Sequence, residues 1–320
     1  MGIRRAAVLL GFAAAASVSF RAAGEETRAH RPAAASLEDA SWARPGADIV
    51  SLLTTSPGEC VKAPEGADEA YAFEVGRAAF RTPFLFGGTA ARAGLSCNSC
   101  HRDGRDNPDF FLEGLSGAPG TADVTSSMFS KVREDGVFNP VAIPTLVDAV
   151  RKSSFGTVSP HGAIEAFVAS AVDEEFGGAP PRAVVSAIAA YVGRLNSAHC
   201  PASPEKRTLG RAMLDVRHAL LAAETALQKG EAETADFLLV AARDGLGRVH
   251  ARMPGEKLRE ERAALTRLSA AIGAFRKDAE TADAAALIDE FEAAFRVVHR
   301  ARRKTLYEPS VLERRLEGGR

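Results

Sequence analysis

The chain has 320 residues, of which 46% are hydrophobic and 25% charged, and its formal net charge at pH 7 is −1. This is an ordinary globular composition, which excludes a disordered or low-complexity chain. The balanced charge gives no whole-chain reason to expect nucleic-acid binding. The length is sufficient for about two domains.

The N-terminus has the pattern of an export signal. A short basic start, residues 1–5, precedes an apolar, alanine-rich run over residues 6–20. The small residues Ala22 and Gly24 suit cleavage before Glu25. We therefore expect residues 1–24 to be a signal peptide, with no integral membrane span, and the mature protein to reside in a bacterial periplasm.

The next segments are short and rich in turn residues. Residues 25–69 have little periodicity and are rich in Ala, Pro, Gly and acidic residues, which predicts an irregular N-terminal arm. A short helix is expected from Tyr71 to Phe80. Residues 83–139 are dense in glycine and predict a long loop, and a loop of this length in a compact domain usually has a functional reason.

That loop contains the sequence Cys97-Asn98-Ser99-Cys100-His101. A zinc site would need a second pair of ligands at similar spacing, and the other two cysteines, Cys60 and Cys200, stand apart. A thioredoxin-like redox pair would need a strand-to-helix setting, which the surrounding glycine-rich loop does not supply. The C-x-x-C-H spacing therefore favours covalent attachment of haem c.

The spacing also makes chemical sense on one helical turn. Positions i, i+3 and i+4 face the same way, so Cys97 and Cys100 can each bond one vinyl group of a porphyrin while His101 binds iron from the same side. Export fits this interpretation, because haem is attached in this way outside the bacterial cytoplasm.

The residues around the motif resemble a known family. "GRAAFRTPFLFGGTAARAGLSCNSCH" (76–101), "DGVFNPVAIPTLVDAV" (135–150) and "PHGAIEAFVASAV" (160–172) are similar to segments of the di-haem cytochrome c peroxidase and methylamine-utilisation family. The resemblance implies a cytochrome c-like haem domain with long loops over about residues 70–200. Those peroxidases carry two haem domains, whereas this chain has a single C-x-x-C-H motif.

Three candidates remain for the sixth position on the iron. Met128 is the only methionine of the expected haem domain, and a thioether ligand raises the reduction potential and favours electron transfer. His161 is the second candidate, and an open or water-occupied position is the third. Met128 is the preferred expectation.

The two remaining cysteines bracket the expected haem domain. In an oxidising compartment an even pair left after haem attachment usually forms a disulfide, so we expect Cys60 to bond Cys200. By the chain-entropy account, closing so long a loop contributes about 5 kcal/mol.

The C-terminal region has helical periodicity. Its apolar residues recur at steps of three and four in four runs, which begin at Leu209, Ala235, Leu258 and Ala284. We expect residues 205–306 to form an antiparallel four-helix bundle whose stripes bury one another, followed by a tail over 307–320. No strand pattern competes in this half of the sequence, so the expected fold class is all-α.

Two functions follow from these features. The first is an exported mono-haem cytochrome that carries single electrons to and from a periplasmic redox partner, with the bundle used for partner docking or for forming a homo-oligomer. The alternative is a peroxidase-like or sensing haem protein with an open iron position, which the family resemblance suggests. The electron carrier is favoured because the sequence has a single C-x-x-C-H motif, one candidate thioether ligand and no visible group of acid–base residues.

Overall fold

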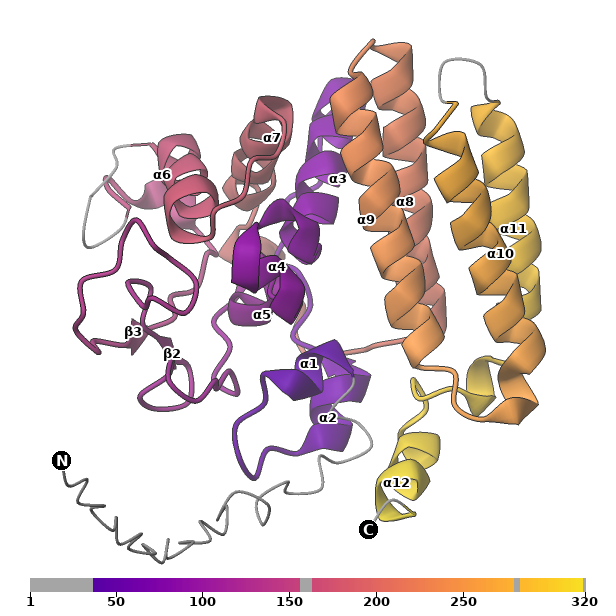
Figure 1. Cartoon of the computed structure of the whole chain (residues 1–320), viewed down its shortest axis with the longest axis horizontal. Coiled ribbons are helices and arrows are strands. Elements are labelled where there is room, and N and C mark those ends of the chain that lie inside the picture. The colour runs from indigo at the N-terminus through magenta and orange to yellow at the C-terminus, as the bar shows by residue number, and fades with distance from the viewer. Residues whose placement is uncertain (1–36, 156–162, 279–282, 319–320) are drawn as a thin grey trace, which may run out of the picture. The chain divides into compact units, whose positions relative to one another are not determined.

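The computed structural model describes residues 37–155, 163–278 and 283–318. These residues are mostly helical (Figure 1), which confirms the all-α class. Two features expected from the sequence, the signal peptide over 1–24 and the ligand candidate His161, lie outside the described residues. Within the described ranges no helix is both long and apolar enough to cross a membrane.

The first part of the described chain consists of mostly short helices separated by loops. The helices are α1 (Glu38–Ser41), α2 (Ile49–Thr54), α3 (Ala67–Arg81), α4 (Gly88–Ala93), α5 (Cys97–Cys100), α6 (Ile164–Ser170) and α7 (Arg182–Gly193). Single turns are η1 (Pro83–Leu85), η2 (Arg102–Gly104), η3 (Ala149–Arg151) and η5 (Ser197–His199), and η4 (Ala171–Glu175) is a π-helical turn. Two antiparallel pairs of two-residue strands join β1 (Thr55–Ser56) to β4 (Glu205–Lys206) and β2 (Thr121–Ala122) to β3 (Val141–Ala142).

The second part contains the long helices. They are α8 (Leu209–Gln228), α9 (Ala232–Ala251), α10 (Arg259–Phe275) and α11 (Ala284–Arg300), with the turns η6 (Glu256–Leu258) and η7 (Arg302–Lys304) and a final helix α12 (Pro309–Glu317) inside the expected tail. The Thr208 side chain caps α8 by accepting from Arg211 N, as Asp283 caps α11 by accepting from Ala285 N. Each long helix buries the apolar stripe read from the sequence: Met213, Leu239, Leu268 and Phe291 are at most 2% exposed.

Helix α3 belongs to both parts of the molecule. It packs against α7 on one side and against α8 and α9 on another, as Figure 1 shows. Phe80 of α3 is buried against Tyr191 of α7, with ring centroids 5.1 Å apart, and it shares one continuous apolar core with Met213 and Val216 of α8. The helices of residues 205–306 therefore bury apolar surface against α3 as well as against one another.

A disulfide joins the expected N-terminal arm to the far end of the expected haem domain. Cys60 and Cys200 form a disulfide with an S–S distance of 2.12 Å, which confirms the pairing predicted from the sequence. Beside it Asn196 N donates to Cys60 O (2.7 Å), and Thr55 pairs with Lys206 in the β1–β4 ladder. The segment before α3 is thereby fixed to the segment between α7 and α8.

The contact between α3 and α7 depends on a glycine. A Cβ atom at Gly76 would lie 2.0 Å from the carbonyl oxygen of Ala187 and 2.8 Å from Cβ of Tyr191. Real Cβ atoms do not approach a backbone oxygen this closely, so only glycine permits the spacing of these helices. Gly76 and Phe80 open the stretch quoted above for the family resemblance, and here both serve helix packing.

We expect Gly76→Ala to destabilise the fold by ~1–3 kcal/mol, because the added methyl group must separate two helix backbones. Gly247→Ala is the matched control: Gly247 lies on an exposed face of α9, and an added Cβ there would meet no described atom within 4 Å. That control should gain up to ~1 kcal/mol from helix propensity. Thermal unfolding followed by circular dichroism measures both, and equal melting temperatures would contradict the close packing of α3 on α7.

Candidate functional site

The Cys97–His101 motif occupies a single helical turn that other side chains hold in place. Ser96 N donates to Ser99 Oγ (3.1 Å), so Ser96 and Ser99 form a capping box at the start of this turn. Asn107 Nδ2 donates to Ser99 O (2.8 Å) and ties the turn to the following loop. Helix α5 therefore presents its cysteines at the i and i+3 positions expected from the sequence.

Cys97 and Cys100 are half-buried free thiols. Burial raises the pKa of Cys97 to about 12 and raises that of Cys100 further, and a negative charge on Glu175 acts in the same direction on both thiols. Both side chains are therefore protonated thiols at neutral pH.

His101 is held in one tautomer. Its ring Nδ1 lies 2.9 Å from the carbonyl oxygen of Pro144. A carbonyl only accepts hydrogen bonds, so Nδ1 donates, and the lone pair of the neutral ring is on Nε2. Burial lowers the pKa of His101 to about 4, which keeps the ring neutral at physiological pH. This is the arrangement by which proteins orient a histidine that binds a metal.

The turn after His101 is also fixed. Asp103 has a φ of +53°, a left-handed conformation that few non-glycine residues adopt. Its backbone N–H donates to Asn98 Oδ1 (2.9 Å), which lies inside the motif. Its carboxylate accepts from Ser56 Oγ and forms an ion pair with Arg81 of α3 at 3.3 Å. Burial opposes ionisation, but the Arg81 guanidinium holds the pKa of Asp103 below its usual range.

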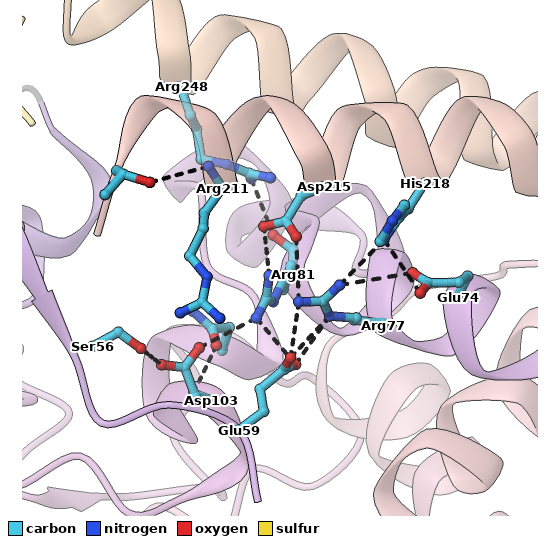
Figure 2. A network of polar contacts seen from close by, with 12 residues as sticks. Ser56, Glu59, Glu74, Arg77, Arg81, Asp103, Arg211, Asp215, His218 and Arg248 are labelled. Atoms are coloured by element: carbon cyan, nitrogen blue, oxygen red, sulfur yellow. Dashed lines mark hydrogen bonds and ion pairs between the residues drawn. The ribbon is translucent and has the colours of Figure 1, made fainter. Parts of the chain in front are cut away.

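Figure 2 shows the polar network that extends from this ion pair to the C-terminal helices. Arg81 also pairs with Glu59 (3.0 Å) and with Asp215 of α8 (2.6 Å). Arg77, one turn earlier, pairs with Glu59 (2.9 Å) and Asp215 (3.4 Å). The network borders a cavity of about 1030 Å³ between α3 and the α8–α9 pair. Because each guanidinium already meets carboxylates, the network is neutralised by the protein itself.

Arg105 lies four residues after His101 and is not part of this network. Its Nε and Nη2 atoms are buried and have no hydrogen-bond partner among the described residues. Two buried guanidinium nitrogens without acceptors are costly, which points to an anionic group that the described residues do not supply. The two carboxylates of a haem are groups of this kind. The cysteines, the oriented histidine and Arg105 therefore fit haem c chemically.

Met128 lies in the loop between β2 and β3 and is half-buried. A Cβ atom at Gly114 would lie 3.3 Å from Met128 Cε, so the thioether methyl packs against the Gly114 turn. The side chain has the partial burial of an adaptable apolar residue, and its role as an iron ligand stays a prediction.

Sequence reasoning missed a buried acid near the motif. Glu175 ends the π-helical turn η4, is 6% exposed, and pairs with Arg133 at 3.2 Å. Burial raises the pKa of Glu175 to about 8, although Arg133 opposes the shift. In the sequence it is the last of the acidic run Asp173–Glu175, which looks like the solvated end of a helix. Only the fold places it where its charge acts on both motif cysteines.

No family model matches the chain, and neither a curated protein nor a solved structure matches it. Across the described part of the chain no three His, Cys, Asp or Glu side chains gather in a group that could hold a metal ion. A haem iron needs no such group, because the porphyrin supplies four of its ligands.

The raised pKa of Glu175 predicts a pH-dependent stability. The folded state binds this proton more tightly than the unfolded state, so the cost of burying the carboxyl is absent below about pH 4.5 and grows as the pH rises towards 8. We expect Glu175→Gln to leave the free energy of unfolding unchanged at pH 4 and to raise it by ~1 kcal/mol or more at pH 8.5.

Urea unfolding at the two pH values measures this difference. Glu174→Gln is the control, because Glu174 also pairs with Arg133 but its side chain is 46% exposed. An equal gain in stability for Glu175→Gln at both pH values would show that Glu175 is not titrating in this range.

Proposed function

We propose that this protein is an exported c-type cytochrome that binds one haem c through Cys97, Cys100 and His101 and carries single electrons. The observation that carries the proposal is the His101 Nδ1 to Pro144 O hydrogen bond, which leaves Nε2 to bind iron beside two free thiols on one helical turn. The resemblance of residues 76–101 to the di-haem peroxidase family supports the same assignment.

Attachment uses the thiols in the form that burial maintains. Each Sγ–H would add across one vinyl group: sulfur would bond one carbon, the hydrogen would go to the other, and no oxidant would be consumed. Cys97 and Cys100 would hold the cofactor, His101 would bind the iron, and Arg105 would pair with a propionate. The chemistry that the haem supplies is one-electron transfer at its iron. Met128 is the proposed sixth ligand.

Export is supported by two features. The first 24 residues have the pattern of a signal peptide, and the chain joins Cys60 to Cys200. Disulfides of this kind persist in oxidising compartments such as the periplasm. Helices α8–α11 are then a four-helix bundle that docks a redox partner or a second copy of the chain.

A peroxidase-like or sensing haem protein with an open iron position is the second candidate. Glu175 favours it, because a buried carboxyl whose pKa is about 8 is mostly protonated at pH 7 and can donate and accept a proton. Its charge acts on both motif thiols, which places its carboxyl near the cysteine motif.

The first test is covalent attachment. We expect the exported protein to retain haem staining after denaturing electrophoresis and the Cys97→Ala, Cys100→Ala double variant to lose it. The control is the Cys60→Ala, Cys200→Ala double variant, which removes the other cysteine pair and should still stain. Staining that survives loss of Cys97 and Cys100 would reject covalent attachment through the motif.

The second test concerns the sixth ligand. We expect the reduced protein to bind carbon monoxide slowly and Met128→Leu to bind it rapidly, because the leucine keeps the volume but lacks the sulfur. Met253→Leu, the same substitution in the core of the C-terminal helices, should leave the rate unchanged. Absorption spectra after mixing measure these rates. Rapid binding by the unmodified protein would instead support the open position.

A further inference from the structure

The turn that follows His101 is tied by backbone hydrogen bonds to the segment that holds the His101 ring. His101 O accepts from Gly104 N (2.9 Å), and Gly104 O accepts from Leu146 N (2.9 Å), so this turn and the segment that holds the His101 ring form one unit. Asp103, in the middle of the turn, has the left-handed conformation described above. A non-glycine residue keeps this conformation only when its surroundings hold it there.

Arg81 links Asp103 to the C-terminal helices. The Asp103 side chain is 7% exposed, and the Arg81 guanidinium is its ion-pair partner on α3. Figure 2 shows Arg81 between Asp103 on one side and Asp215 on the other. The shorter contact of Arg81 is with Asp215, at 2.6 Å against 3.3 Å.

Both helices of the α8–α9 pair contact Arg81. Asp215 on α8 accepts from its guanidinium, and Arg248 on α9 donates to its backbone carbonyl oxygen (3.0 Å). The position of Arg81, and through it the position of Asp103, is therefore set by Glu59 before α3 together with two residues more than 100 positions later in the chain.

We propose that Asp215, Arg81 and Asp103 form a positioning chain by which the C-terminal helices hold the turn that carries His101. The role of His101 as an iron ligand rests on the proposed function. The contacts that join Asp215, Arg81 and Asp103 do not depend on it. Asp215 is then a positioning residue, since it acts on the site only through Arg81 and Asp103. Through this positioning chain the C-terminal helices would influence the reduction potential of an iron bound by His101.

The experiment is hydrogen exchange on the full-length exported protein, with Asp215→Asn as the variant. The asparagine keeps the shape of the side chain and removes its charge. We expect the backbone amides of Asp103 and Gly104 to exchange at least tenfold faster, because they donate to Asn98 and His101 within the turn. The midpoint potential of the haem should shift in the same variant.

The matched control is Asp236→Asn. Asp236 is on α9 and pairs with Arg276 at 2.6 Å. The change therefore removes one negative charge from a C-terminal helix, as Asp215→Asn does, but from a surface ion pair that does not include Arg81. We expect the exchange of Asp103 and Gly104 and the midpoint potential to stay at their original values. Equal acceleration in both variants would overturn the proposal, since it would show general loosening of the helices.

A second variant distinguishes loss of the Asp215–Arg81–Asp103 contacts from general misfolding. Asp103→Asn removes the charge at the other end of the same positioning chain. Residues that act through one another have non-additive effects on a measured property. We expect the Asp103→Asn, Asp215→Asn double variant to exchange no faster than the faster single variant. Unchanged exchange in Asp215→Asn, additive effects in the double variant, or an unmoved potential would each overturn the proposal. Exchange is measurable without haem, so loss of haem staining and loss of coupling are separate results.

Discussion

Two arginines one turn apart on α3 impose the main constraint on this structure. Arg77 and Arg81 are largely buried, and a guanidinium cannot escape the cost of burial by releasing its proton. Their charges must therefore be met by carboxylates. Those carboxylates come from separate parts of the chain, since Glu59 precedes α3, Asp103 follows the cysteine motif and Asp215 lies on α8. Neutralising two side chains brings three distant segments together.

This constraint explains why the region around the cysteine motif and the C-terminal helices share one core. An apolar contact between α3 and α8 tolerates sliding, whereas ion pairs with defined donors fix its register. Tyr191 of α7 adds to the same arrangement by donating to Glu59 (2.6 Å). The polar network thus specifies how the helices fit, and the apolar residues around it, such as Phe80 and Val216, supply most of the stabilisation.

The sequence was sufficient for features that depend on local pattern. The apolar stripes gave the four long helices, the C-x-x-C-H spacing gave the turn of α5, and the cysteine count gave the disulfide. It was insufficient wherever a charged residue is buried by something distant in the chain. Arg77, Arg81 and Glu175 have the appearance of solvated helix positions, and their partners are only known once the helices are packed. The role of Arg105 is harder still to predict from the sequence, because its two buried nitrogens lack an acceptor among the described residues.

The raised pKa values of the motif cysteines have a consequence for maturation. Oxidation of a cysteine requires its thiolate, so a protonated thiol in a buried turn reacts slowly with oxidants and with other disulfides. If the chain is exported as proposed, four thiols enter the same compartment, and the two that are three residues apart could form a disulfide with each other. In the folded chain, burial suppresses that side reaction while Cys60 and Cys200 are already joined. Under the proposed function, the fold would thus act as a protecting group that keeps the Cys97 and Cys100 sulfurs available for bonding to carbon.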